Sequence, residues 1–242
     1  MRNCRQKANG WSRRRPRRAL PAASTSANRE VPNDTGRLAQ ADVRVSGGRS
    51  GEGQKRVSRR PLVSVFGSSR AKAPEALYQE AYTLGRLLGE AGFDVATGGY
   101  RGVMEAVSRG AAAGGAHVVG ITVANFKDEV NPFIAQEIRA ADIYARLRHL
   151  LESADAYVAL RGGMGTLCEV VFAWQMLKLE LLRPRPLILL GQCWEPVLTQ
   201  WLEHLTVTEK DCDCFTLTRT PQEAVTVLAT LLAASKNAPV RP

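Results

Sequence analysis

From Leu62 onward, short apolar runs alternate with longer stretches of helical pattern, and this alternation constrains the fold more than any other feature of the chain. Such alternation is typical of βαβ units, in which helices connect parallel strands. The sequence therefore predicts an α/β fold of three layers with a mostly parallel sheet of about six strands. The expected strands are Leu62–Phe66, Phe93–Thr97, His117–Thr122, Ala156–Leu160, Leu187–Leu190 and a weaker Phe215–Leu217.

The stretches between these strands have the spacing of helices with one apolar face. Pro74 and Pro221 suit the first turn of a helix, where the missing N–H of proline has no cost. We expect a single Rossmann-like domain over residues 61–236, followed by a short C-terminal tail at 237–242. The expected helices are Pro74–Ala91, Val103–Ala113, Asp142–Ser153, Thr166–Leu179, Glu195–Leu205 and Pro221–Ala234.

The positive charge of the chain is concentrated in residues 1–60, which hold 16 of its 33 Lys and Arg residues and 4 of its 23 Asp and Glu residues. The net charge is thus +12 for this segment and −2 for residues 61–242. Because the segment is Arg-rich and aperiodic, we expect a disordered basic tail. An organelle transit peptide, an early start codon and non-specific attraction to RNA or a membrane surface are the alternatives. Specific nucleic-acid binding by the domain is not expected.

The remaining composition indicates a soluble protein without a metal site. No apolar run approaches the roughly 20 residues that span a bilayer. The five cysteines lack disulfide-framework or zinc spacing, and the CxC at Cys212–Cys214 is interpreted as an ordinary turn. Reduced thiols favour a cytoplasmic location, with an organelle as the alternative if the tail is a transit peptide.

Three turns that follow expected strands carry the candidate binding residues, since ligands of parallel sheets bind beyond the carboxyl ends of the strands. The first turn, Gly67–Arg70, offers a glycine and two serine hydroxyls. The second, Thr97–Gly102, precedes a helix whose N-terminus favours an anion. The third, Leu160–Glu169, has three glycines within four residues, which suits backbone amides clustered around an oxyanion. The expected ligand-binding residues are Gly67, Ser68, Gly98, Gly99, Gly102, Met104, Gly162, Gly163, Gly165 and Thr166.

Thr166 is also expected to cap the helix of the third turn, and Glu169 to lie about one turn into that helix. The GGxGTxxE run at Gly162–Glu169, the GGxxGxM run at Gly98–Met104 and the Gly67–Ser69 turn occur in one order along the chain. Together they resemble the LOG ("lonely guy") family of Rossmann-like proteins, formerly called lysine decarboxylase-like proteins and part of the wider SLOG superfamily. The resemblance covers about residues 62–205.

The resemblance implies a phosphoribohydrolase that cleaves the N-glycosidic bond of a nucleoside 5′-monophosphate, such as AMP or a cytokinin nucleotide, to free base and ribose 5-phosphate. It implies Arg146 and Glu169 as the catalytic pair, no cofactor, and a homodimer or larger homo-oligomer. The alternative is a nucleotide or cofactor carrier of the same fold that does not hydrolyse its ligand. Several positions depart from the family pattern and alter the expected base pocket: Thr97, Glu105, Leu147, Arg161 and Cys168.

Overall fold

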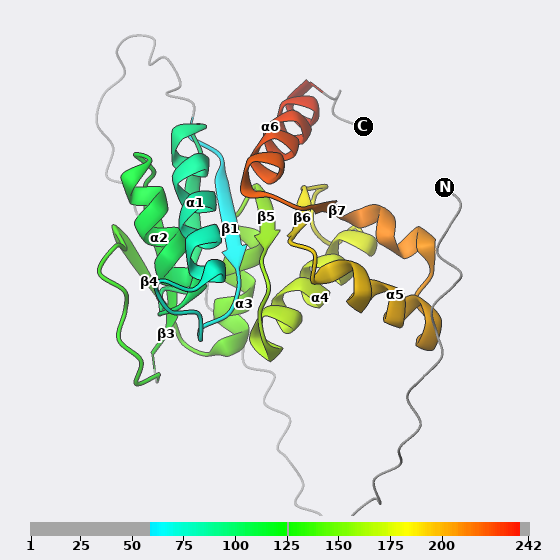
Figure 1. Ribbon diagram of the computed structural model, residues 1–242, viewed down its shortest axis with the longest axis horizontal. Helices are drawn as coiled ribbons and strands as arrows, with labels where there is room; N and C mark the ends of the chain where they lie inside the picture. The colour runs from blue at the N-terminus through cyan, green and yellow to red at the C-terminus, as the bar shows by residue number, and fades with distance from the viewer. Residues whose placement is uncertain (1–58, 125, 238–242) are drawn as a thin grey trace, which may run out of the picture. The chain divides into compact units, whose positions relative to one another are not determined.

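The computed structural model describes residues 59–124 and 126–237. The expectations for the basic tail therefore fall almost wholly outside the described residues, as do those for 238–242. The described part forms an α/β domain (Figure 1). Its elements are β1 (Leu62–Phe66), α1 (Ala76–Glu90), β2 (Asp94–Thr97), α2 (Val103–Ala113), β3 (Val118–Val123), β4 (Gln136–Ala140), α3 (Ile143–Glu152), β5 (Ala156–Ala159), α4 (Met164–Lys178), β6 (Leu187–Leu190), α5 (Trp194–His204), the 3₁₀ helix η1 (Glu209–Cys214), β7 (Thr216–Thr218) and α6 (Pro221–Asn237).

The sheet has seven strands in the order β4-β3-β2-β1-β5-β6-β7, and every neighbouring pair is parallel. The α/β prediction is confirmed, but the expected count of about six strands omits β4. This strand reads Gln-Glu-Ile-Arg-Ala, and four of its five residues are at least partly exposed because it forms one edge of the sheet. An edge strand with charged side chains has no apolar run to reveal it, and charges at an edge protect it from pairing with other chains.

Helices cover both faces of the sheet, and each face has its own apolar core. Val63, Val65 and Val95 point to the face covered by α1, α2 and α6. Phe66 and Tyr157 point to the opposite face, covered by α3, α4 and α5. Successive strand residues alternate between the faces, so strands buried on both sides consist almost wholly of apolar residues. This double burial explains why the central strands are recognisable from sequence.

Two prolines were expected in the first turn of a helix, and the structure confirms only one of them. Pro221 is the first residue of α6, as expected. Pro74 is not in the first turn of α1, since that helix begins at Ala76 after Glu75. The prediction for Pro74 is therefore wrong: the proline belongs to the loop that leads from β1 into the helix. No helix in the described part of the chain is long and apolar enough to cross a membrane.

The order of the strands determines where a ligand site can form in this sheet. The chain builds β1, β2, β3 and β4 outward in one direction, and α3 then returns it to β5 on the other side of β1. The loops after β1 and β5 consequently leave the sheet in opposite directions and open a crevice between them. The first and third glycine-rich turns are these two loops.

Candidate functional site

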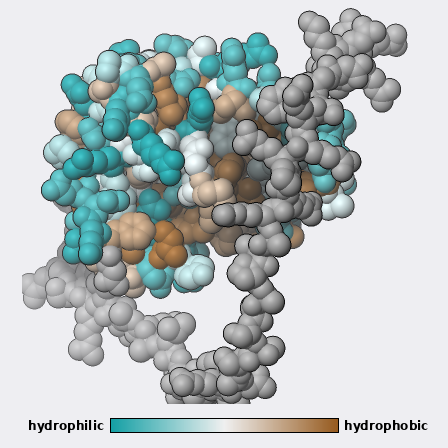
Figure 2. All heavy atoms as spheres, turned by 60° about the horizontal axis from the view of Figure 1, so that its bottom comes forward, coloured by the Kyte–Doolittle hydropathy of each residue, from teal (hydrophilic) through white to brown (hydrophobic). Residues whose placement is uncertain are grey.

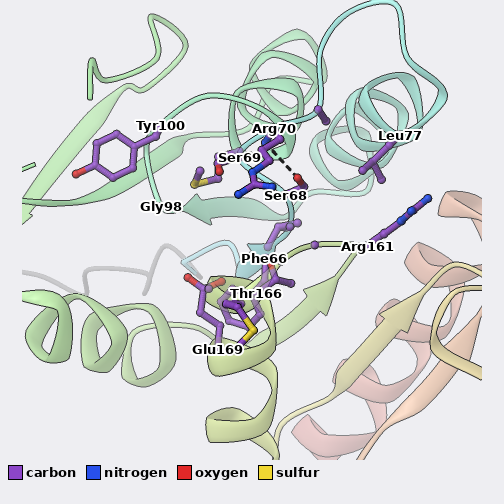
Figure 3. Close-up of a pocket in the computed structure, with 18 of the residues that line it drawn as sticks. Phe66, Ser68, Ser69, Arg70, Leu77, Gly98, Tyr100, Arg161, Thr166 and Glu169 are labelled. Atoms are coloured by element: carbon purple, nitrogen blue, oxygen red, sulfur yellow. Dashed lines mark hydrogen bonds between the residues drawn. The ribbon is translucent and has the colours of Figure 1, made fainter. Parts of the chain in front are cut away.

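A cavity of about 980 Å³ opens at the carboxyl ends of the strands, at the point where the strand order reverses. All three glycine-rich turns contribute to its wall, together with the start of α3 (Figure 3). Ten of the twelve expected site residues line it. They are Gly67, Ser68, Gly98, Met104, Arg146, Gly162, Gly163, Gly165, Thr166 and Glu169.

Arg146 and Glu169 form an ion pair at the base of this cavity. Nη1 of Arg146 lies 3.1 Å from Oε1 of Glu169, and the two side chains are only 10% and 13% exposed. Nε of Arg146 donates a hydrogen bond to the carbonyl of Ile121 in β3 at 2.9 Å. A charged pair this far from solvent is costly to bury, so its position beside a large cavity favours a function in ligand chemistry over one in stability.

Burial raises the pKa of Glu169 above its ordinary value of 4.5. The neighbouring Arg146 guanidinium opposes this effect through its charge and its hydrogen bond, but desolvation is the larger influence. The carboxyl group therefore holds a proton at higher pH than an exposed glutamate does. A carboxyl group whose pKa is raised in this way suits proton transfer better than an exposed glutamate does.

Gly98 makes room for the Arg146 side chain. A Cβ atom at residue 98 would overlap with Nη2 of Arg146 and approach Sδ of Met104 to 2.6 Å. The second glycine-rich turn thus leaves space for the guanidinium between β2 and Glu169. This close approach is a packing reason for the glycine that sequence spacing alone does not reveal.

The N-terminus of α4 presents a group of backbone amides to the cavity, which we call the α4 amide cradle (residues 164–166). Gly163 is the N-cap residue, and no side chain caps the helix. The prediction that Thr166 caps α4 is therefore wrong, because Thr166 lies inside the first turn and packs against Gly162. Among the described residues these first amides have no acceptor, as expected for a helix start that faces an open cavity. The cradle can bind a small anion.

Gly99 and Gly102 do not line the cavity. Gly102 has a φ of +77°, and a side chain there would also collide with the backbone of Ser68 and Ser69. This close approach lets the amide of Val103 donate to the carbonyl of Ser68 at 2.8 Å, which joins the first and second turns. Gly102 thus supports the site without lining it, because it lets the first two turns approach each other.

Several lining residues were not expected from sequence. Tyr100 packs its ring against Phe126 with centroids 5.8 Å apart, and its hydroxyl accepts from the amide of Val123 at 2.9 Å. Ile143 lies at the start of α3. Ile143 follows the missed strand β4, so recognition of β4 would have placed it at the ligand edge of the sheet. Phe126 follows β3, which was expected, and it was not singled out. Arg70 and Arg161, on the first and third turns, also line the cavity.

The parallel sheet, the glycine-rich turns and the cavity at the switch point define a Rossmann-like α/β protein with a ligand site of the kind that accepts an anionic small molecule. The particular family follows from comparison with known proteins. The chain belongs to the SLOG cluster4 family, whose model matches residues 60–224.

Curated relatives confirm the similarity to LOG proteins. An uncharacterised protein from Archaeoglobus fulgidus is 35% identical over 111 residues, which are 46% of this chain and 72% of that protein. Cytokinin riboside 5′-monophosphate phosphoribohydrolase LOG7 of Arabidopsis thaliana is 39% identical over 127 residues, 50% of this chain and 58% of that enzyme. The match thus spans less than two thirds of the enzyme's length.

One solved structure matches this fold over nearly the whole length of the solved protein. The molybdenum cofactor binding protein from the phototrophic bacterium Rippkaea orientalis is 25% identical, with a TM-score of 0.59. The alignment covers 72% of this chain and 99% of that protein. Relatives named as hydrolases and relatives named as cofactor-binding proteins therefore share this architecture.

Proposed function

We propose that the protein is a phosphoribohydrolase that hydrolyses the N-glycosidic bond of a purine nucleoside 5′-monophosphate to free base and ribose 5-phosphate. The observation that carries this proposal is the buried Arg146–Glu169 pair in the same cavity as the α4 amide cradle. Relatives named as phosphoribohydrolases support the class of reaction. AMP is the first substrate to test.

The cradle holds the 5′-phosphate in this proposal. The N-terminal amides of a helix and its dipole attract an anion without any positively charged side chain. With the phosphate on residues 164–166, Glu169 lies one turn further along the same helix, on the side of the ribose. Thr166 is buried against Gly162 with its hydroxyl at the cavity wall, where it can add a hydrogen bond to the phosphate.

Hydrolysis breaks the bond between C1′ and the base nitrogen while the oxygen of water forms a bond to C1′. The sugar passes through a state with positive charge on C1′ and the ring oxygen, and the Glu169 carboxylate stabilises this charge and orients the water. The base leaves with a proton. Arg146 holds Glu169 in place and offers a guanidinium on the side of the departing base.

Release of free base from a panel of nucleoside 5′-monophosphates tests the proposal with the full chain. We expect Glu169→Gln and Arg146→Ala each to lower kcat by at least about 100-fold, the typical contribution of a positioned catalytic group. Exposed neighbours serve as matched controls: Arg148→Ala and Glu152→Gln lie on α3 outside the cavity and should keep the rate. Hydrolysis that survives in both site variants would contradict the assignment.

The alternative function is a carrier that binds its ligand without hydrolysis. The observation that favours it is the likeness to the cofactor-binding protein from Rippkaea orientalis, which this chain covers almost completely. The same experiment separates the two functions, because a carrier binds a phosphorylated ligand with micromolar or better affinity and releases no base from any nucleotide. In a carrier, Glu169→Gln would alter affinity alone.

A further inference from the structure

The loop between β3 and β4 brings a carboxylate to the cavity that the proposed reaction does not use. Asp128 lines the cavity and is exposed, and within the described part of the chain its carboxylate has no ion pair or hydrogen bond. Phe126, two residues earlier, also lines the cavity and is 53% exposed. An exposed ring beside an unpaired carboxylate can bind a planar ligand that donates a hydrogen bond.

Contacts on both sides of Asp128 hold this loop against the second glycine-rich turn. Before it, the ring of Phe126 packs against the ring of Tyr100, with centroids 5.8 Å apart. After it, the buried side chain of Asn131 donates to the carbonyl of Tyr100 at 3.1 Å. The backbone amide of Asn131 also donates to the carbonyl of Gly99 at 2.9 Å. The loop thus follows the position of the second turn.

The second turn also borders the reacting pair. A Cβ atom at Gly98 would overlap with Nη2 of Arg146 and lie 2.6 Å from Sδ of Met104, so these two side chains are neighbours in the cavity. Figure 3 shows Gly98 and Tyr100 on the same side of the cavity. In the proposed function the guanidinium of Arg146 is on the side of the departing base. A base bound in this way therefore extends toward the second turn and the β3–β4 loop.

The polar side chains on this side of the cavity favour one kind of base edge. The guanidinium of Arg146 is paired with Glu169, and the hydroxyl of Tyr100 accepts from the amide of Val123. Among the described residues that line this side, Asp128 is thus the one with an unengaged polar side chain. An ionised carboxylate only accepts hydrogen bonds. It therefore attracts an amino group on the base and repels a carbonyl oxygen.

We infer that Asp128 determines the specificity for the base: its carboxylate accepts a hydrogen bond from the 6-amino group of a purine that lies against the ring of Phe126. This inference rests on the proposed function and narrows its substrate class to 6-aminopurine nucleoside 5′-monophosphates, with 6-oxopurine nucleotides disfavoured. Stacking on an aromatic ring accepts every base, so the carboxylate supplies the discrimination. The hydrolysis step itself is unchanged.

Calorimetric titration of the full chain with AMP, IMP and GMP tests the subsite, with base release measured on the same preparation. AMP has a 6-amino group where IMP and GMP have a 6-oxo group. We expect AMP to bind about tenfold more tightly than IMP, the lower end of what a hydrogen bond to a charged group contributes. Asp128→Asn should bring this ratio toward one, because an amide of nearly the same size can donate as well as accept.

Glu129→Gln is the matched control. It removes the same charge from the next residue, whose carboxylate pairs with Arg101 at 2.9 Å and does not line the cavity, so the AMP to IMP ratio should stay unchanged. Equal binding of AMP and IMP, tighter binding of GMP than of AMP, or an unaltered ratio in Asp128→Asn would overturn the subsite, while base release would still support the proposed function. A preference for AMP that depends on Asp128, without base release, would support the subsite and contradict the proposed function. If no nucleotide binds, both are wrong.

Discussion

At the scale of single residues, two different physical reasons explain why glycine occupies particular positions of this site. Gly98 and Gly162 are packed against Arg146 and Thr166, so a side chain at either position would displace a neighbour. Gly163 and Gly165 have nothing within 4 Å of an added Cβ. Packing inside the protein does not demand glycine there, which points to the ligand as the reason.

Gly165→Ala separates stability from binding. Because the added methyl group enters open space on a helix, we expect the free energy of unfolding to rise or stay equal, by at most about 1 kcal/mol. The same methyl group lies at the cradle, so affinity for AMP should fall about tenfold or more through lost contact with the phosphate. Chemical denaturation and calorimetric titration of one preparation give both values. Unchanged affinity would remove residue 165 from the cradle.

The raised pKa of Glu169 makes stability depend on pH. The folded-state pKa lies above the ordinary 4.5, so the folded protein binds the proton more tightly than the unfolded chain. This contribution is fully present below about 4.5 and is lost as the pH rises through the folded-state pKa. We expect the wild type to lose stability relative to Glu169→Gln over that window in urea denaturation at a series of pH values. Parallel pH profiles for the two proteins would show that Glu169 does not titrate this way.

At the scale of elements, α1 and α2 pack closely through glycines on both helices. A Cβ atom at Gly110 would overlap with the carbonyl of Tyr82, and one at Gly85 with that of Val107. Backbone atoms cannot move aside as side chains do, so the helices depend on these missing side chains. This pair of helices covers the sheet behind the first and second turns and holds them in place.

Gly110→Ala should therefore destabilise the protein by about 3 kcal/mol, the upper end of the usual cost of overpacking. The measurement is the free energy of unfolding from denaturant titration. Ala112→Ser, on the exposed side of the same helix, adds one atom without a clash and should change stability by no more than about 0.5 kcal/mol. Equal effects from the two substitutions would mean that the helices can separate at little cost.

At the scale of the whole domain, apolar side chains are exposed along one surface of α3 and α4. The most exposed are Tyr144 (78%) and Met164 (81%), and Ile143, Val171 and Phe172 are also exposed. Met164, Val171 and Phe172 recur at helical spacing, so they form one stripe of α4. Figure 2 shows apolar residues gathered on the face that lies at the bottom of Figure 1. An apolar surface of this kind is typical of a contact between subunits.

We expect this surface to pair two copies of the chain, in agreement with the oligomer that the LOG resemblance implies. Sedimentation velocity should give a dimer for the wild type. Tyr144→Glu and Phe172→Glu should each shift it to a monomer, because a buried, unpaired charge opposes association. Leu231→Glu is the control, since it adds the same charge to an exposed leucine of α6, on the other face of the sheet. A monomeric wild type would contradict the expectation.

Sequence alone was sufficient for the parts of this protein that depend on local pattern. The buried strands are apolar on both faces, and the runs at Gly98–Met104 and Gly162–Glu169 mark the turns after two of them. Helix starts were less reliable, and the expectations for Pro74 and Thr166 were wrong. Pro74 precedes the N-cap residue Glu75, and Thr166 lies three residues after the N-cap residue Gly163. The edge strand β4 was missed because its polar residues have no pattern that separates a strand from a loop.

Only the tertiary structure decided which residues share the cavity. Arg146 and Glu169 are 23 positions apart on different helices, and their contact depends on α3 and α4 both packing on one face of the sheet. The LOG resemblance implied the pair, but its burial, its raised carboxyl pKa and the space left by Gly98 follow from packing. Local sequence determines how a segment folds, whereas the distances between segments depend on strand order and on which side chains fill the core between them.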